Sequence, residues 1–365
     1  MIQGATAGDQ IQAQPTIDQA GPVASVVDLF CGAGGLSHGF YQEGFRIVGG
    51  VDFDENCRYA FEANNDAPFI RRDVAKLTAR EIDSLFLSGR PRVLIGCAPC
   101  QPFSTYNQKN DDPKWELLSQ FAKLIDQVRP DVVSMENVPR LLDFKDGQLF
   151  NDFVATLRNA DYDVVWKVLY GPDFGMAQTR SRLVLLASRL GKIELPVPTH
   201  IDGYRTVRDE IGDLPALTHG SVDPTDHLHC ASRLSEINVK RIEASRPGGT
   251  WRDWPKELVA RCHTTTTGKG YSSVYGRMTW DSPSPTITTQ FFGFGNGRFG
   301  HPEQERALSL REGAMLQGFP RDYEFAPPGD RIHFKAVGRL IGNAVPVKLA
   351  NAIAKAVKLH LGQYE

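Results

Sequence analysis

The sequence contains no apolar run approaching the length, about 18 residues, that a membrane-spanning helix needs. It also lacks a marked excess of either charge: 41 Lys and Arg stand against 43 Asp and Glu, a formal net charge of −2. This balance argues against a polybasic nucleic-acid binder, although it leaves room for a local basic face. Cysteine is scarce and irregularly spaced, with six in 365 residues, so we expect no disulfide framework and a reducing, cytoplasmic location.

The beginning of the chain has neither the basic start nor the apolar stretch of a signal peptide. Residues 1–23 are polar and rich in Gly, Ala and Gln, and we interpret them as a flexible leader. The remaining length is enough for two domains with a sizeable core.

Residues 24–190 alternate short apolar runs with amphipathic stretches, a pattern typical of βα units on a parallel sheet. Near-continuous runs such as VVDLF and RVLIGCA suit strands that are buried on both faces. The rhythm changes at Asp163–Tyr170 and Arg182–Arg189, two strand-like segments without room for a helix between them. We therefore expect an α/β sheet that ends in an antiparallel strand pair.

Beyond Leu190 proline recurs, and a Gly-rich stretch at 291–300 interrupts any long element. We predict a second, irregular domain over 191–330. Residues 331–365 contain an amphipathic helix, Pro346–Leu361, and form a C-terminal segment that we expect to return to the first domain.

A glycine-rich turn, DLFCGAGG at 28–35, follows the first predicted strand and opens the first helix. Glycines let the backbone approach a ligand, and Asp52, at the end of the second strand, lies 20 residues after Gly32, the spacing of a ribose-binding carboxylate. Phe53 could stack on an adenine, and Asp73, after the apolar Phe69-Ile70, is expected to occupy the end of the next strand. These residues favour a bound nucleoside cofactor over a glycine-rich turn that binds none. They do not distinguish NAD from other nucleoside cofactors.

Cys97 and Cys100 are spaced as in a thioredoxin-type redox pair. Redox chemistry is disfavoured because Cys97 belongs to the apolar strand run and Pro102 makes a following helix improbable. We predict a structural Cys97 beside a functional Cys100, with Glu136 at the same end of the neighbouring strand.

At these residues the chain resembles the C5-cytosine DNA methyltransferase family, and the resemblance extends over about residues 25–360. The motifs that carry it occur in the family's order: the turn at 28–35, Pro99-Cys100-Gln101, Glu136-Asn137-Val138, Gln178-Thr179-Arg180-Ser181-Arg182, RALSLREGAMLQGFP at 306–320, and Gly342-Asn343-Ala344-Val345-Pro346. Asp52 stands where Glu is frequent, and Ser309 where Thr is usual. The resemblance implies a Rossmann-like class I methyltransferase sheet with a smaller, irregular target-recognition domain.

The resemblance implies a catalytic set of Cys100, Glu136, Arg180 and Arg182. Cys100 would attack C6 of cytosine and so activate C5, while Glu136 would bind the N3 and amino edge of the base. The two arginines would contact the base carbonyl, a phosphate or the catalytic strand ends, with Arg182 deeper in the structure and Arg180 nearer the base. A cytosine in a duplex would have to be flipped out of the helix.

S-adenosylmethionine is the implied cofactor, and double-stranded DNA the implied partner, with no metal, no obligate protein partner and a monomeric enzyme. The cofactor contacts implied are Phe30, Gly32, Gly34, Asp52, Phe53, Asp73 and Asn343; for Asn343, capping of the terminal helix is the alternative. The implied DNA contacts are Gln101, Ser104, Arg277, Thr286 and Arg298. The polar segment Gln101–Lys114 is either a lid over the DNA or a surface loop.

Residues Val239–Gly300 hold nine Lys and Arg against four Asp and Glu, a local charge of +5. Phosphate contacts from such a segment would set affinity and salt dependence. Arg277 and Arg298 are candidate guanine readers, although a phosphate contact is the commoner use of a single arginine. Asp226–Cys230, with two His and one Cys, lacks the second ligand pair of a zinc site, and we expect a surface loop.

Two alternatives stay open on the sequence. An RNA methyltransferase would keep every catalytic motif, and a catalytically silent DNA-binding paralogue would keep the fold. The Thr286-Ile287 pair and the basic segment favour DNA over RNA, and the intact Cys100 and Glu136 argue against a silent protein.

Overall fold

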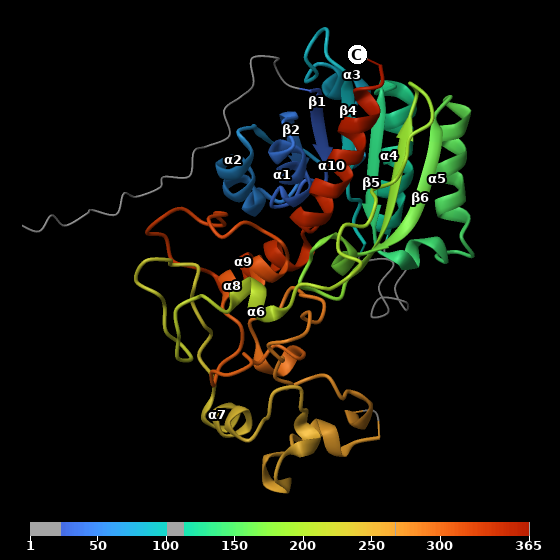
Figure 1. The fold of residues 1–365 in the computed structure, drawn as a ribbon. Helices are drawn as coiled ribbons and strands as arrows, with labels where there is room; N and C mark the ends of the chain where they lie inside the picture. The colour runs from blue at the N-terminus through green and yellow to red at the C-terminus, as the bar shows by residue number, and fades with distance from the viewer. Residues whose placement is uncertain (1–22, 101–112, 267, 365) are drawn as a thin grey trace, which may run out of the picture.

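The computed structural model describes residues 23–100, 113–266 and 268–364, and its centre is one seven-stranded sheet (Figure 1). The strand order is β3-β2-β1-β4-β5-β7-β6. The strands are β1 (Ser25–Leu29), β2 (Arg46–Asp52), β3 (Phe69–Arg71), β4 (Arg92–Gly96), β5 (Val132–Asn137), β6 (Asp163–Tyr170) and β7 (Ser181–Ser188).

The first five strands pair in parallel, whereas β7 runs antiparallel to both β5 and β6. The predicted α/β sheet with a terminal antiparallel pair is therefore confirmed. Every residue of β1 and of β5 is buried, as the continuous apolar runs predicted. The carboxyl ends of β1, β2, β4 and β5 consequently share one edge of the sheet, where open α/β folds place their ligands.

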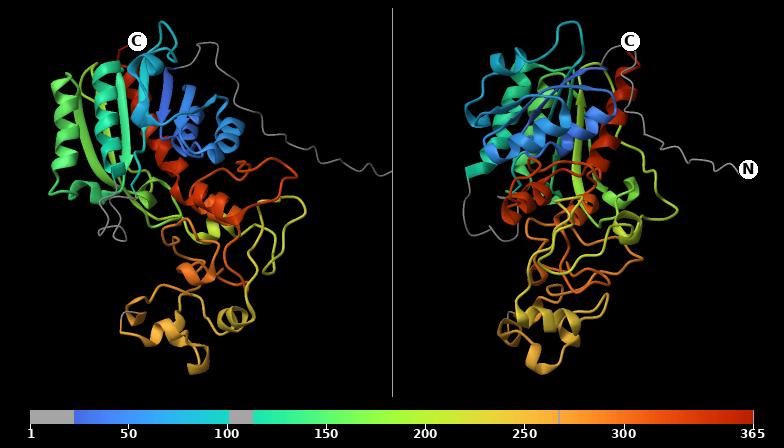
Figure 2. Two further views of the ribbon diagram at one scale, coloured as in Figure 1. Left: turned by 180° about the vertical axis from the view of Figure 1, so that it is seen from behind. Right: turned by 90° about the vertical axis from the view of Figure 1, so that its left-hand side faces the viewer.

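Helices cover both faces of the sheet (Figures 1 and 2). Apolar residues of α1 and α10 pack with Val26, Ile47 and Ile95 on one face, and those of α4 and α5 pack with Val27 and Leu94 on the other. The α-helices are α1 (Gly35–Gln42), α2 (Arg58–Asn65), α3 (Ala79–Asp83), α4 (Glu116–Val128), α5 (Gln148–Asn159), α6 (Val207–Ile211), α7 (Glu236–Glu243), α8 (Leu310–Leu316), α9 (Phe334–Asn343) and α10 (Val347–Leu361).

Residues 191–330 are mostly loops and short helical turns, and α7 with its neighbours extends away from the sheet at the bottom of Figure 1. A small separate core lies here, built around Ile242, Trp251, Trp254 and Phe294. The predicted segment 331–365 holds α9 and α10, and α10 packs against α1 of the sheet layer. No helix in the described part of the chain has the length and apolar character needed to cross a membrane.

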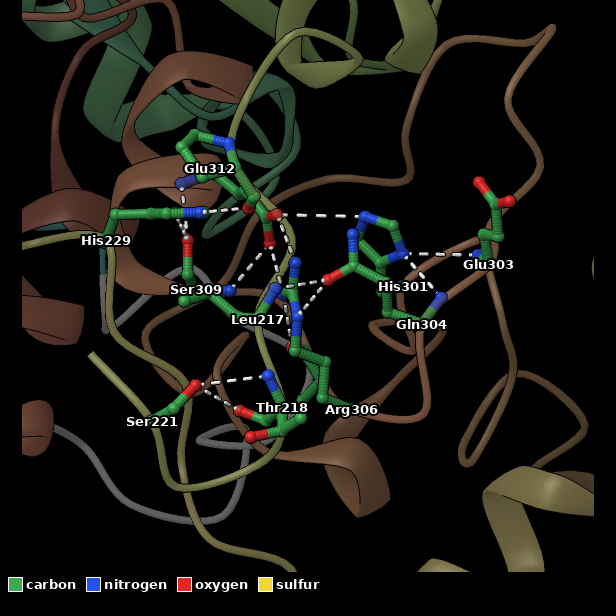
Figure 3. Close-up of polar contacts among 12 residues, drawn as sticks. Leu217, Thr218, Ser221, His229, His301, Glu303, Gln304, Arg306, Ser309 and Glu312 are labelled. Carbon is green, nitrogen blue, oxygen red and sulfur yellow. Dashed lines mark hydrogen bonds and ion pairs between the residues drawn. The ribbon is translucent and has the colours of Figure 1, made fainter. Parts of the chain in front are cut away.

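A buried polar network fixes the turn before α8 (Figure 3). Arg306 binds Glu312 through two hydrogen bonds of 2.7 Å, and the Ser309 hydroxyl caps α8. His229 joins this network, with Nδ1 2.9 Å from Ser309 Oγ and Nε2 2.8 Å from the Pro215 carbonyl. This use of both ring nitrogens makes the 226–230 segment a structural element, and it corrects the expectation of a surface loop. The described residues contain no group of three or more His, Cys, Asp or Glu that could hold a metal.

Candidate active site

A cavity of about 770 Å³ opens at the carboxyl ends of β1, β2 and β4. Its volume lies within the range of about 300–1,000 Å³ that is typical of small-molecule sites. Two groups of predicted residues meet in its lining. Those predicted to hold the cofactor are Phe30, Gly32, Asp52, Phe53, Asp73 and Asn343, and the predicted nucleophile is Cys100.

The glycine-rich turn forms one wall of the cavity and contains three residues with positive φ angles: 61° at Phe30, 52° at Gly32 and 87° at Gly34. A Cβ on Gly32 would have no atom within 4 Å, because Gly32 faces the cavity. Gly34 is not part of the lining, and a Cβ there would lie 2.3 Å from Asn65 Nδ2. Gly34 is therefore required for the turn and for packing against α2.

Asp52 lies between the turn and the end of β2. Its Oδ2 accepts from the Gly32 amide and its Oδ1 from the Asp54 amide, both at 3.0 Å. Burial raises the pKa of Asp52 above its ordinary value, opposed by these amide hydrogen bonds. Phe53, which follows it, exposes 67% of its surface and lines the cavity, where its ring is accessible to a ligand.

Two further elements complete the cofactor wall. Asp73 follows β3 rather than ending it, and its carboxylate accepts from the Ala75 amide. Asn343 ends α9 and lines the cavity, so it does not cap α10, whose N-cap is Pro346. Arg339, a lining residue that sequence reasoning did not identify, pairs with Asp54 at 2.7 Å.

The predicted catalytic residues meet where β4 and β5 end. Gly96 pairs with Met135 in the parallel ladder, so the next residues, Cys97 and Glu136, stand side by side. Glu136 is 1% exposed, and its Oε2 accepts from the Cys97 thiol at 2.9 Å. Cys100 follows three residues later and lines the cavity. The Asn137 amide donates to the Ala98 carbonyl at 3.0 Å and ties the two strand ends together.

The two arginines differ from the prediction in their depth. Arg180 is the buried one, and its guanidinium donates to the carbonyls of Ile287 and Gly342 at 3.0 and 3.4 Å. Arg182 is partly exposed, and its Nε lies 2.8 Å from Glu136 Oε1. The order is reversed because Arg180 precedes β7 and meets the 287 segment, whereas Arg182 on β7 faces the end of β5.

The charges around Cys100 oppose one another. Burial raises the pKa of its thiol above the ordinary value, and the carboxylate of Glu136 adds to the rise, while the positive charges of Arg182 and Arg180 lower it. Positive charges are therefore close to Cys100, but burial outweighs their effect on its pKa. Arg180 itself has its pKa lowered to about 9, first by burial and then by repulsion from Arg182.

The predicted DNA contacts have mixed outcomes. Arg277 is buried, and its guanidinium donates to the carbonyls of His301, Ile242, Ser245 and Gln304, an arrangement that favours a structural role over the reading of a guanine. Arg298 Nη1 binds the carbonyls of Gly248 and Gly249 at 2.6 and 2.9 Å.

Thr286 donates to the Thr179 carbonyl at 2.7 Å and so joins the 286 segment to the strand layer. Gln101 and Ser104 lie outside the described residues, as does most of the Gln101–Lys114 segment. Beside Thr286, buried Gln178 accepts from the Ile287 amide and donates to the Leu316 carbonyl. Its place in the Gln-x-Arg-x-Arg motif was the signal for this role.

Three comparisons with known proteins bear on this site. A sequence model of the family described as "C-5 cytosine-specific DNA methylase" matches residues 24–359. The "Type II methylase M.HgiDII" of Herpetosiphon aurantiacus is 51% identical, over 93% of this chain and 96% of the relative. The "Type II methyltransferase M1.HphI" of Haemophilus parahaemolyticus is 33% identical, over 91% and 86%.

A crystal structure described as a putative DNA modification methyltransferase encoded within a prophage of E. coli has a TM-score of 0.72. It is 24% identical and covers 93% of this chain and 99% of its own, so it supports the similarity of the fold.

Proposed function

The chain belongs to the C-5 cytosine-specific DNA methylase family, and on that premise we propose that Cys100, Glu136 and Arg182 are its catalytic group. The observation that carries this proposal is their meeting beside the cavity where β4 and β5 end. We further propose a duplex DNA substrate with a specific sequence, as in type II modification. This last point is supported by the printed name of the relative that is 51% identical.

S-adenosylmethionine fits the lining of the cavity. Gly32 leaves room where any side chain would stand, Asp52 presents a carboxylate suited to ribose hydroxyls, and Phe53 offers a ring to the adenine. Asp73 and Asn343 also line the cavity. When bound, this cofactor supplies an electrophilic methyl group.

The residues of the chain prepare cytosine to accept that group. As a thiolate, Cys100 adds to C6, and the electrons of the C5–C6 double bond shift into the ring so that C5 becomes nucleophilic. Glu136 binds the N3 and amino edge and stabilises the charge that develops there. After C5 has gained the methyl group, loss of the C5 proton and elimination of Cys100 restore the aromatic ring and the thiolate.

Arg182 positions Glu136, and Arg180 holds the surrounding framework. Since Arg180 bonds to the carbonyls of Ile287 and Gly342, it ties the catalytic strands to the segments that precede and follow α8. We infer that residues 24–190 with 331–365 form the catalytic domain and that 191–330 recognise DNA. Base flipping into this site would cost a few kcal/mol of unstacking and unpairing.

We also infer a monomer in the cytoplasm. All six cysteines are free, and four of them line the cavity, which suits a reducing compartment. A monomer can methylate the two strands of a palindromic site in turn.

The test is transfer of labelled methyl groups from S-adenosylmethionine to duplex DNA and, in parallel, to tRNA. We expect label in DNA alone, and we expect Cys100→Ser to abolish it while the protein stays folded. Label in tRNA alone would replace the DNA substrate by RNA, and label retained by Cys100→Ser would overturn the covalent role. Bisulfite sequencing of DNA from an expressing host then identifies the methylated cytosine.

A further inference from the structure

The carboxylate of Glu136 has a partner on each of its two oxygens. Cys97 Sγ donates to Oε2 at 2.9 Å, and Arg182 Nε lies 2.8 Å from Oε1. The approach of Arg182 does not complete a hydrogen bond, so Oε1 is a buried acceptor that is still unsatisfied. The thiol of Cys97 is thus the only side-chain hydrogen-bond donor to Glu136 among the described residues.

We propose that Cys97 is a positioning residue for the proposed methyl transfer: together with Arg182, its thiol fixes the plane of the Glu136 carboxylate, whose unsatisfied Oε1 can then accept from the flipped base. This inference rests on the proposed function. A Glu carboxylate rotates readily about its last torsion, so a buried carboxylate without partners on both sides has no fixed plane. Donation to Oε2 on one side and the charge of Arg182 beside Oε1 on the other hold the carboxylate in one orientation, and the unsatisfied acceptor capacity of Oε1 is left for the base edge.

The backbone supports this arrangement. The parallel register of β4 and β5 places Cys97 opposite Glu136, and the Asn137 side chain binds the Ala98 carbonyl one residue further along each strand. The two contacts cross-link the strand ends immediately before Cys100. These contacts hold the start of the segment that leads from β4 to Cys100 against the end of β5.

Cys97 is suited to donate and unsuited to attack. Burial raises the pKa of its thiol well above the ordinary value, and the neighbouring carboxylate of Glu136 adds to the rise. The thiol therefore keeps its proton near neutral pH and remains a donor. At Cys100, the positive charges of Arg182 and Arg180 both oppose the rise of the thiol pKa that burial causes. The two cysteines of one short motif thus have different roles.

Three substitutions separate hydrogen bonding from packing. Cys97→Ser keeps a donor, Cys97→Val keeps apolar volume without a donor, and Cys97→Ala keeps neither. We expect Ala and Val to slow single-turnover methylation of duplex DNA at least about tenfold, the size of one lost hydrogen bond to a charged group. Cys97→Ser should stay within about threefold of the wild type.

Controls exclude indirect effects. Because Cys97 also lines the cavity, the dissociation constant of S-adenosylmethionine is measured by calorimetry for each variant and is expected to change less than about threefold. A duplex carrying 5-fluorocytosine traps the Cys100 adduct, and adduct formation should slow in parallel with methylation. The loss should therefore fall on kcat and not on the KM for the cofactor.

The outcomes are decisive. Wild-type rates in Cys97→Ala, or rescue by Val but not by Ser, would overturn the positioning role. If Ala does not fold, the comparison of Ser with Val decides alone. A wild-type protein that labels no DNA would instead refute the proposed function, so the two failures are distinguishable.

Discussion

Arg306 and Glu312 form a doubly hydrogen-bonded ion pair, with Nη1–Oε2 and Nη2–Oε1 both at 2.7 Å and exposures of 0% and 1%. The Ser309 amide adds a third hydrogen bond to Oε2 at 2.8 Å. Burial acts to raise the pKa of Glu312, but the charge and hydrogen bonds of Arg306 outweigh it, and the pKa falls to about 2. The pair fixes the turn into α8 on which both Gln178 and Arg311 depend.

Glu312→Gln should destabilise the protein strongly because it leaves the buried charge of Arg306 unpaired. We expect a loss of about 3–5 kcal/mol in the free energy of unfolding at pH 7, measured by urea denaturation. Since the folded pKa of Glu312 is depressed, its contribution is present above about pH 4.5 and disappears as the pH falls toward 2. Arg208→Gln, at an exposed ion pair, is the control and should change little. A loss as small as the control's would refute this account.

His301→Gln should flatten the acid dependence of stability in a different window. Nδ1 of His301 accepts from the Glu303 and Gln304 amides, and burial lowers the pKa of the ring to about 4. The stability it supports is complete above about pH 6.5, the unfolded value, and is lost as the pH falls to about 4. In the variant, the free energy of unfolding should fall by up to about 3 kcal/mol less than in the wild type between these two pH values. His333→Gln, at an exposed site, is the control and should show the same loss of unfolding free energy with falling pH as the wild type.

The strands β1 and β5 were predictable because their apolar runs suit burial on both faces, and β6 has the predicted bounds Asp163–Tyr170. The helix α5 was missed, although its buried residues Leu149, Phe153 and Leu157 repeat at helical spacing. The predicted C-terminal helix Pro346–Leu361 begins one residue later, at Val347, with Pro346 as its N-cap. Local signals thus placed elements better than they placed their ends.

The candidate site was predicted from the motifs, but the depth of its arginines was not. Arg277 belongs to a basic segment, and only the fold reveals that backbone carbonyls of four distant residues use its donors. The reversed depths of Arg180 and Arg182 depend on how β7 meets the 287 segment, a long-range contact. The contact between Cys97 and Glu136 could have been predicted, because each directly follows one residue of the paired positions Gly96 and Met135 on adjacent parallel strands.

Gly32→Ala and Gly34→Ala should have opposite phenotypes. At Gly32 a Cβ meets no atom within 4 Å, so the substitution should cost only the left-handed strain of about 1 kcal/mol while it weakens S-adenosylmethionine binding at least about tenfold. At Gly34 a Cβ would meet Asn65 and Phe61 at 2.3 and 3.0 Å, so stability should fall by about 2–4 kcal/mol. Thermal unfolding and calorimetric titration distinguish them. Equal cofactor affinity in Gly32→Ala and the wild type would contradict the proposed binding wall.

Charge removal in the basic segment should weaken DNA binding only at exposed positions. Lys256→Gln, Arg261→Gln and Lys269→Gln remove exposed cations, and each should lower affinity and reduce the slope of log K against log salt by about 1 if its residue contacts a phosphate. Arg277→Gln should instead lower the melting temperature, because four carbonyl contacts are lost. Fluorescence anisotropy over a salt series is the measurement. If the Arg277→Gln protein keeps normal stability and loses only its sequence preference, Arg277 reads a base.

The rate of methylation should rise with pH because the reactive form of Cys100 is the thiolate. Since burial, the largest effect, raises the pKa of this thiol, little thiolate exists at neutral pH, and its fraction grows about tenfold per pH unit below the pKa. Single-turnover methylation at saturating DNA should follow that increase from about pH 6.5 upward. Arg182→Gln removes a charge that lowers this pKa, so its profile should lie further to the alkaline side. DNA and cofactor affinities measured at each pH provide the control. A wild-type rate that is flat across this range would mean that Cys100 is already ionised, or that a step other than its attack limits the rate.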